Sequence, residues 1–330
     1  MAEFLTFDTD LTAVANAIRV KGGTSAQLIY PSGFVSAIQA IQTGITPKLV
    51  VTTTPGAAIT ATPAEGFKVV KGTAGADGMC TLELPKAGTW HVTAMANSVS
   101  NSQHIVIGTQ NMLLPLYHDT FANNTWEEII TVCRTGIAPD SWAVGDSKTM
   151  NIGGTAYQVD IIGKNHDEYA DGSGTAPLTF QLHDCYSEAK QMYSTNLSGL
   201  GWKNTDMRLA YLPAILALMP AEVKNGIHAV NKKTSEGGNS TTIEIVSDTL
   251  FLLSEVEIFG TASSSVAGEG SQYDYYKAGN PKIKKREGVD EFWWERSSAS
   301  GGMFCRVRAN GQAGASNASS SLGVSFAFCF

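Results

Sequence analysis

The stretch from His166 to Ser173 is the densest polar group in the sequence. His166, Asp167 and Glu168 are consecutive, and Asp171-Gly172-Ser173 follow two residues later. Side-chain oxygens of this kind can bind a divalent cation such as Ca²⁺. The group lacks the alternating spacing and the terminal glutamate of a calcium-binding loop, however. The pattern therefore favours a turn after the strand-like run IIGKN, in which aspartate side chains cap backbone amides.

A second candidate for chemistry is the run His183-Asp184-Cys185, which places a base close to a nucleophile. Catalytic dyads are assembled in space, and residues i and i+2 of a strand share a face whatever their chemistry. The chain also contains no GxSxG, P-loop or HExxH motif, and no GxGxxG before a helix. We therefore expect no enzymatic activity, no cofactor and no metal site.

The third candidate is a binding surface near the C-terminus, in the run MFCRVRA. Strand alternation assigns its side chains to two opposite faces. The face predicted to be buried carries Met303, Cys305 and Val307, and the face predicted to be exposed carries Phe304, Arg306 and Arg308. An aromatic residue beside arginines is the composition of a binding hot spot.

Two aromatic clusters flank a segment that has almost no large side chains. Residues 309–321 are all Gly, Ala, Ser or Asn except Gln312. On one side stand Trp293 and Trp294, which could stack on a sugar or a base. Successive strand residues point to opposite faces, so at most one ring is exposed and one is expected in the core. On the other side, GVSFAFCF predicts a terminal strand with one buried face, and the whole arrangement predicts a surface held by a packed framework.

The elements that position these residues change character along the chain. Residues 1–45 predict a helix capped by Asp10 and ended at Gly22-Gly23, then a second helix with Phe34, Ile38 and Ile41 on one face. Residues 46–108 contain short strand-like runs separated by glycine-rich turns, which predicts a small immunoglobulin-like β-sandwich acting as a spacer. The helices of residues 1–45 are too small to form a core, so we expect this segment to mediate attachment and oligomerisation.

Residues 109–330 predict a mixed α+β domain. Thr125-Trp126-Glu127-Glu128 is a capping box that opens a helix running to Gly136. A second helix is predicted in MRLAYLPAILALM, where Pro213 kinks it or delays its start. The remaining runs predict strands: AYQVDIIG, PLTFQLHDC, TIEIVSDTLFLLS and EVEIF.

Composition limits the classes of function. Charged residues make up 16 % of the chain, and the net charge of −7 gives no footprint for nucleic acid or an anionic membrane. The basic cluster of Lys282, Lys284, Lys285 and Arg286 is interpreted as a solvated loop. Five widely spaced cysteines without a CxxC motif predict buried free thiols. The N-terminal run has no signal-peptide pattern and no run is long enough to span a membrane.

The C-terminal segment FWWERS…FCRV…NG…NASSSLGVSFAFCF resembles the variable region of proteins diversified by phage and bacterial diversity-generating retroelements. Those proteins end in a C-type-lectin-like domain. The upstream runs NHDEYADGSGTAPLTFQLHDC, GWKNTDMR and LFLLSEVEIFG resemble a lectin-like domain of Firmicutes prophage tail genes, and TDLTAVANAIRVKGG is similar to the start of many phage tail proteins. The chain departs from ordinary prophage relatives at Glu295 and at Ser325-Phe326-Ala327.

The resemblance implies a site and a framework within a variable region at about residues 292–330. In that family, reverse transcription alters adenines of Asn codons, which leaves small and polar residues at a solvent-facing surface. The implied framework residues are Trp293, Trp294, Phe304, Phe326 and Phe328. The implied ligand-binding residues are Ser298, Ala299, Ser300, Gly301, Gly302, Arg306, Arg308, Ala309, Ala313, Gly314, Ala315 and Ser316.

The resemblance further implies a receptor-binding protein of a phage tail tip, assembled in the virion after synthesis in the bacterial cytoplasm. Its expected partners are a protein or glycan of the host surface, other phage tail proteins, and two further copies in a homotrimer. No nucleic acid and no membrane insertion are expected. Two alternatives stay open: a non-diversified structural tail protein or cellular adhesin, and an enzyme of the formylglycine-generating type. The enzyme would need a reactive cysteine pair such as Cys305 and Cys329.

Overall fold

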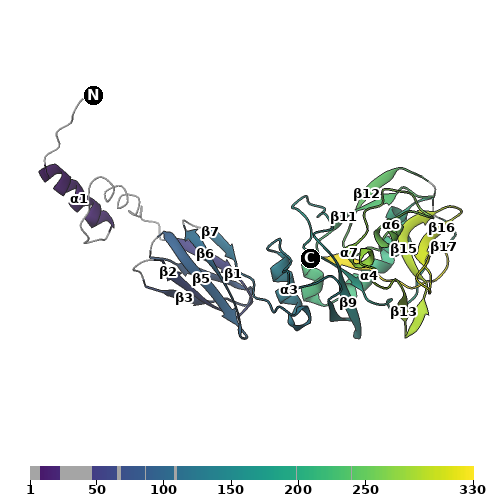
Figure 1. Ribbon diagram of the computed structural model, residues 1–330, viewed down its shortest axis with the longest axis horizontal. Helices are drawn as coiled ribbons and strands as arrows, with labels where there is room; N and C mark the ends of the chain where they lie inside the picture. Colours follow the sequence, from purple (N-terminus) through teal and green to yellow (C-terminus); the bar gives the residue numbers. More distant parts are fainter. Residues whose placement is uncertain are drawn as a thin grey trace, which may run out of the picture. The chain divides into compact units, whose positions relative to one another are not determined.

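The computed structural model describes residues 8–22, 47–64, 68–85, 87–107, 110–197, 199–238 and 240–330. The chain divides into two compact units, and the division falls between Leu116 and Tyr117 (Figure 1). Most of the regular structure is β-sheet, accompanied by a few short helices. A β-rich fold of more than one domain, as the sequence predicts, is thus confirmed.

The first described element is helix α1 (Asp8–Gly22). The helix ends at Gly22, the first residue of the Gly22-Gly23 pair that was predicted to end it. Its side chains Ala15 and Ile18 are buried, whereas Val14, expected on the same face, is 48 % exposed. The second helix expected around Phe34, Ile38 and Ile41 lies outside the described residues.

The described residues between 47 and 116 contain seven strands in two sheets. One sheet has the order β4-β1-β7 and the other β3-β2-β5-β6. Alternate strand residues point into a shared core that includes Leu49, Ile59 and Trp90, each at most 1 % exposed. The strands are β1 (Lys48–Thr52), β2 (Ala58–Pro63), β3 (Val70–Thr73), β4 (Met79–Glu83), β5 (Gly88–Ala96), β6 (Val99–Ile107) and β7 (Gln110–Leu113).

The seventh strand moves the boundary between the units. The sequence predicts this boundary at residues 108–109. In the structure β7 runs parallel to β1, with Leu49 opposite Gln110 and Thr52 opposite Leu113. Leu114 and Leu116 then complete the same core, both at most 2 % exposed. The boundary lies later because this edge strand is part of the sheet it completes.

The C-terminal unit contains one four-stranded sheet, one three-stranded sheet and two hairpins. The four-stranded sheet has the order β18-β10-β9-β8, so the last strand of the chain pairs with β10. The three-stranded sheet has the order β15-β16-β17. The strands are β8 (Ser147–Ile152), β9 (Thr155–Lys164), β10 (Leu178–Leu182), β11 (Val230–Ser235), β12 (Ile243–Asp248), β13 (Lys284–Arg286), β14 (Val289–Glu291), β15 (Trp293–Ala299), β16 (Met303–Val307), β17 (Ala313–Asn317) and β18 (Ala327–Cys329).

Short helices connect these sheets. The predicted capping box at Thr125 and Glu128 is confirmed: Thr125 Oγ1 accepts from the Glu128 amide and the Glu128 carboxylate accepts from the Thr125 amide. Neither unit contains a described helix that is long and apolar enough to cross a membrane. The helical elements are η1 (Phe121–Asn123), α3 (Trp126–Cys133), η2 (Trp202–Asn204), η3 (Met207–Tyr211), α4 (Leu212–Leu218), α5 (Ala221–Gly226), α6 (Glu255–Phe259) and α7 (Asp274–Lys277).

One predicted strand, EVEIF, is wrong because these residues form helix α6. Ser254 and Glu257 make a second capping box, and Gly260 adopts a left-handed conformation with φ of 77° that ends the helix. The apolar residues of this run alternate, which suggested a strand. Capping bonds and the burial of both glutamates outweigh that pattern.

In the core of the C-terminal unit, the last residues of the chain pack against strand β10. Phe326 and Phe328 are fully buried, and the Phe328 ring stacks on Phe180 with 5.3 Å between centroids. All residues from Leu322 to Phe330 are buried. The expected terminal strand therefore has both of its faces covered rather than one. Its backbone also pairs with β10 and bridges to Phe251.

Replacing Phe328 by Ala should lower the free energy of unfolding of the C-terminal unit by about 3–5 kcal/mol, since it leaves a cavity among stacked rings. Phe326→Ala should have a similar effect. Ile245→Ala is the control: this β12 side chain is 62 % exposed, so its loss should change stability by no more than about 0.5 kcal/mol. Chemical denaturation of the full chain measures all three. Unfolding of both Phe variants at the wild-type denaturant concentration would contradict this packing.

Candidate ligand-binding surface

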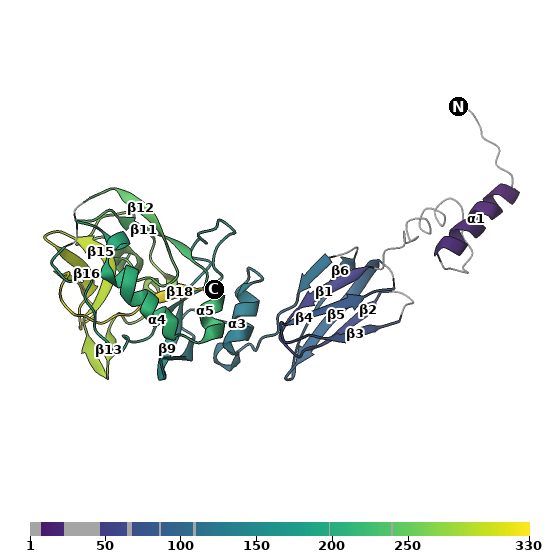
Figure 2. The same cartoon turned by 180° about the vertical axis from the view of Figure 1, so that it is seen from behind.

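The predicted variable region forms the sheet β15-β16-β17, with β16 in the centre. Strand β15 pairs with β16 through Trp293 opposite Val307 and Ser298 opposite Phe304, with a bulge between Trp294 and Ser298. Strand β17 pairs with β16 through Arg306 opposite Gly314. In both views the sheet lies close to the β11-β12 hairpin, on the side of the unit away from α3 (Figures 1 and 2).

Two loops project from opposite ends of β16. Residues 300–302 connect β15 to β16, and residues 308–312 connect β16 to β17. The second loop is closed by a hydrogen bond from the Arg308 amide to the Gln312 carbonyl at 2.7 Å. A five-residue strand separates the two loops by about 16 Å. The predicted binding residues are therefore divided between two ends of the sheet.

Burial separates the predicted binding residues into three groups. Ser300, Gly301 and Arg308 are exposed, as expected. The intermediate group is Gly302, Arg306, Ala309, Ala313, Ala315 and Ser316. Ser298, Ala299 and Gly314 are buried, which corrects the expectation that they face solvent.

The buried positions have separate physical causes. Strand β15 is covered on both faces along its whole length, which buries Ser298 and Ala299. Ser298 Oγ also donates to the Gly238 carbonyl at 3.3 Å. Gly314 is covered by a neighbouring side chain, because a Cβ atom added there would lie 2.8 Å from Arg308 Nε.

All five predicted framework residues are buried. Trp293 and Trp294 are both fully buried, so neither ring can stack on a sugar. Their indole groups donate to the carbonyls of Lys282 and Lys190, at 2.9 and 2.8 Å. Phe304 is also fully buried, which corrects the exposed position that strand alternation gave it. The alternation fails because both faces of the sheet are packed.

One part of the sheet is open and basic. The Arg306 guanidinium lies over the Phe292 ring, 4.2 Å from its centroid, and Arg308 crosses Gly314 on the neighbouring strand. Burial and the neighbouring Arg308 charge both lower the pKa of Arg306. We call Phe292, Arg306, Arg308 and Gly314 the arginine face. By strand register, Ala313 and Ala315 belong to the opposite face, beside Val307 and Cys305.

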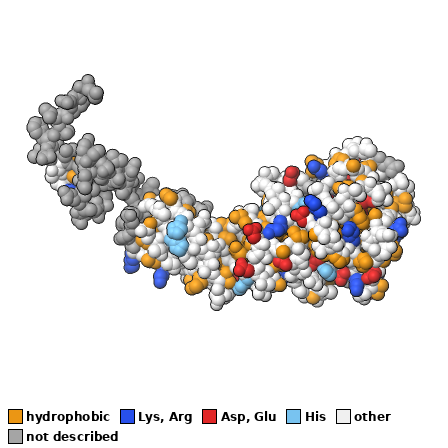
Figure 3. Space-filling model, viewed as in Figure 1, with side chains coloured by type: hydrophobic (Ala, Val, Ile, Leu, Met, Phe, Trp, Pro, Cys, Tyr) orange, Lys and Arg blue, Asp and Glu red, His pale blue; other side chains and the backbone are white. Residues whose placement is uncertain are grey.

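Charge elsewhere on the C-terminal unit is mixed. On the side visible in Figure 3, acidic and basic side chains are interspersed and do not form a patch of one sign. The predicted basic cluster is not a solvated loop throughout. Lys284 is buried, and its ammonium donates to the Leu182 and His183 carbonyls. Burial lowers its pKa to about 8.

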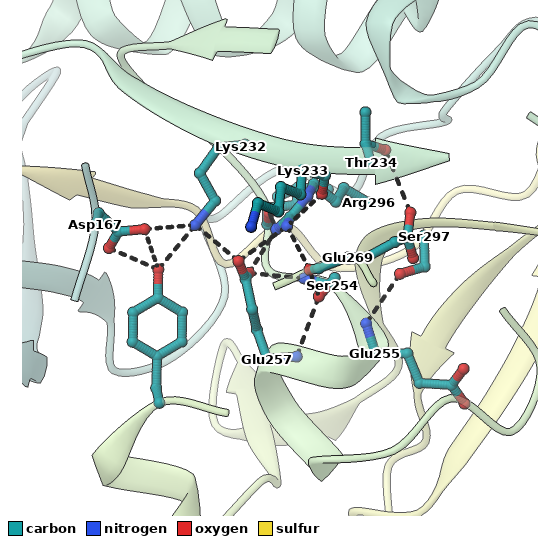
Figure 4. A network of polar contacts seen from close by, with 12 residues as sticks. Asp167, Lys232, Lys233, Thr234, Ser254, Glu255, Glu257, Glu269, Arg296 and Ser297 are labelled. Carbon is teal, nitrogen blue, oxygen red and sulfur yellow. Dashed lines mark hydrogen bonds and ion pairs between the residues drawn. The ribbon is translucent and has the colours of Figure 1, made fainter. Parts of the chain in front are cut away.

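Beside β15 a buried network of charges connects four parts of the unit (Figure 4). The Glu257 carboxylate accepts from Arg296 at 2.5 and 2.9 Å and pairs with Lys232 at 2.7 Å. Lys232 in turn pairs with Asp167 at 2.6 Å and donates to Tyr273 at 3.0 Å. Lys232, Glu257 and Arg296 are each at most 2 % exposed. The network thus ties β15, α6, β11 and the loop after β9 together.

Mutual pairing keeps these buried groups ionised. Burial alone would raise the pKa of Asp167, but the Lys232 charge and hydrogen bonds from Lys232 and Thr179 lower it to about 2. Burial would lower the pKa of Lys232, yet Asp167 and Glu257 raise it. Burial would also raise the pKa of Glu257, whereas Arg296 and Lys232 lower it. The charges therefore compensate one another in the interior.

Glu295, next to Arg296 in β15, behaves differently. It is fully buried, and neither carboxyl oxygen has a hydrogen-bond partner among the described residues. Burial raises its pKa well above the usual range, and the nearby carboxylates of Glu255 and Glu269 raise it further. Glu255 stays ionised because Ser263, Ser264 and Ser265 donate to it. The raised pKa favours the protonated form of Glu295, whereas serine donors favour the ionised form of the neighbouring Glu255.

The predicted polar group at His166–Ser173 adjoins a cavity of about 270 Å³. Glu168, Asn231 and Lys233 are among the residues that line it. Asp167 is committed to Lys232, and Asp171 Oδ1 accepts from the Ser173 amide at 2.9 Å. Within the described ranges, no three His, Cys, Asp or Glu side chains are grouped so as to hold a metal ion. This geometry matches the turn that the sequence favoured.

The remaining candidate groups are the run His183-Asp184-Cys185 and the other cysteines. His183 Nδ1 lies 2.7 Å from Asp160, and burial raises the pKa of the Cys185 thiol to about 12. Cys305 and Cys329 lie in different sheets, β16 and β18, so the pair that the alternative enzyme would need is not formed. All five cysteines are buried free thiols, as predicted.

Sequence reasoning missed the residues that hold the surface in place. Lys232, Glu257 and Arg296 are charged residues that no apolar pattern marks as buried, and the alternation in EVEIF assigns Glu257 to the polar face. Only the capping-box spacing of Ser254 and Glu257 gave a signal that could have found one of them. Phe292, which supports Arg306, stands in the quoted run FWWERS but was not assigned to the surface.

Comparison with known proteins finds a family model that matches part of this unit. Residues 179–330 match the model of the family "Domain of unknown function (DUF6273)". The match includes β10, the buried network apart from Asp167, the sheet β15-β16-β17 and the terminal strand. No curated protein and no solved structure matches the chain.

The neutral state of Glu295 can be tested with Glu295→Gln. The amide replaces a protonated carboxyl, so we expect unchanged or increased stability at neutral pH. The pKa of Glu295 is higher in the folded protein than in the unfolded chain, where it is about 4.3. Glu295 therefore contributes fully to stability only below about pH 4.3, and this contribution is lost as the pH rises. The advantage of the variant over wild type should therefore grow between about pH 4 and pH 7. Chemical denaturation across this range measures it.

Glu257→Gln is the matched comparison, since it removes one charge from the same buried region. It should cost about 3–5 kcal/mol because Arg296 and Lys232 lose a shared counter-charge. Equal destabilisation by the two variants would show that Glu295 is ionised and paired in the folded protein.

Proposed function

We propose that this chain is a phage tail adhesin whose C-terminal unit binds a receptor on the surface of a host bacterium. One observation carries the proposal: two exposed loops and the arginine face project from a sheet whose framework residues are completely buried. A rigid scaffold that presents exposed loops is the usual arrangement of a binding site. The likeness of residues 292–330 to retroelement-diversified proteins supports the same function.

The proposal extends to the fold of each of the two units. Seven strands in two sheets over one core favour an immunoglobulin-like spacer in the N-terminal unit. The C-type-lectin-like assignment of the C-terminal unit rests on the sequence resemblance. It is supported by a terminal strand that returns to pair with β10.

Diversification of the surface is supported by where the small residues lie. Ser300 is exposed at one loop, and Ala309 and Gln312 lie in the other. Substitutions at such positions disturb little packing, so a retroelement could alter them without unfolding the domain. Ser298, Ala299 and Gly314 fit this role less well because they are buried.

Replacing Ser300 or Gln312 by Tyr should weaken binding of the full chain to bacterial cells at least about tenfold, because a bulky ring blocks the exposed loop. Stability should change by no more than about 0.5 kcal/mol. Flow cytometry of labelled protein on a panel of Firmicutes strains measures binding. Ile137→Tyr is the control, since Ile137 is 63 % exposed outside the sheet. Wild-type binding by both loop variants would place the receptor site elsewhere.

The proposal includes assembly in the virion as a homotrimer through residues 1–45. Val14 and Val20 are exposed apolar side chains of α1, and tail proteins with similar N-termini support oligomerisation. Light scattering should give three times the chain mass for the intact protein and a smaller particle for a chain that lacks residues 1–45. A monomeric intact protein would contradict this prediction.

A further inference from the structure

The arginine face contains two cations that lack a counter-charge. Among the described residues, no carboxylate forms an ion pair with Arg306 or Arg308, although Arg286, Arg208 and Arg296 each have one. Arg306 Nε is buried without a hydrogen-bond partner. Glu291, close in sequence, is engaged by Arg286 and by the Phe292 amide.

The geometry holds the two side chains together in spite of their like charge. Arg306 is oriented by the Phe292 ring at 4.2 Å, which is a favourable contact for a guanidinium. Arg308 lies across β17 at Gly314, where an added Cβ atom would come within 2.8 Å of its Nε and the arginine side chain would have to shift. Two adjacent planar donors of this kind match the oxygen atoms of carboxylate or phosphate groups.

We propose that the arginine face binds an oxyanion, carboxylate or phosphate, carried by a glycan of the bacterial surface. This inference rests on the proposed adhesin function and names the chemistry of its ligand. An anion placed between the guanidinium groups removes their mutual repulsion and supplies acceptors for the unpaired donors.

A glycan fits this surface better than a protein does. Interfaces with proteins are built around buried aromatic or other apolar anchors. Between Phe292 and Phe330 no large hydrophobic side chain is exposed. The accessible groups of the loop next to Arg308 are instead small or amide-bearing, such as Ala309, Asn310 and Gln312, and one exposed apolar side chain, Ile283, lies against Gly311. Hydroxyl-rich ligands pair with such groups.

The test uses the full chain and three defined probes: phosphorylated dextran, polygalacturonate and unmodified dextran. The wild type should bind at least one charged polymer, more weakly at high salt, and should not bind dextran. The preferred polymer identifies phosphate or carboxylate as the ligand group. Arg306→Gln and Arg308→Gln should each weaken binding at least about tenfold, as expected for charge-assisted hydrogen bonds.

Two further variants separate geometry from net charge. Gly314→Ala keeps every charge but displaces Arg308, so it should also weaken binding. The double variant Lys224→Gln/Lys277→Gln removes two exposed charges outside the sheet and should bind within about twofold of wild type. If this control lost as much binding as the arginine variants, binding would depend on net charge alone, and the inference would be wrong.

Labelling of bacterial cells distinguishes failure of the inference from failure of the proposed function. If the wild type labels cells but binds neither charged polymer, the adhesin function stands and the oxyanion inference is wrong. If labelling is abolished by protease treatment of the cells and unaffected by Arg306→Gln and Arg308→Gln, the receptor is a protein and the inference is again wrong. If the wild type labels no cells, the proposed function itself fails.

Discussion

The buried Glu257 carboxylate is the interaction on which the arrangement of the C-terminal unit depends. It caps α6 through the Ser254 amide, receives both terminal nitrogens of Arg296 from β15, and pairs with Lys232 from β11. Lys232 extends the contact to Asp167 after β9. Removing one member of such a network leaves an uncompensated charge in the interior, which is far more costly than losing a surface pair. The network therefore permits few alternative placements of β15.

The fixed position of β15 also supports the exposed loops of the sheet β15-β16-β17. The strand is buried on both faces and forms one edge of the sheet whose centre is β16. Arg296 also donates to the carbonyls of Leu252, Lys233 and Glu269, so the strand is anchored by its backbone surroundings as well as by charge. Exposed positions on the loops of this sheet can then differ in sequence without loss of the framework, which suits the proposed adhesin.

The sheet offers two chemically different ends rather than one continuous surface. Residues 300–302 present hydroxyl and backbone groups, whereas the end near residues 308–312 carries the arginine face. A ligand that spans both ends must extend over about 16 Å, which is longer than a single sugar ring. Of the two ends, only the one with the arginine face carries the charge that the proposed anionic glycan requires.

The sequence by itself determined the features that depend on neighbouring residues. Alternating runs and glycine turns located most strands, and the spacing of Thr125 and Glu128 located a helix start, because turns and caps are local interactions. Only the tertiary structure decided which face of a strand is covered. Ser298 and Phe304 are buried, and Glu257 and Arg296 meet across 39 residues, because packing from both sides and charge pairing between distant segments leave no periodic pattern in the chain.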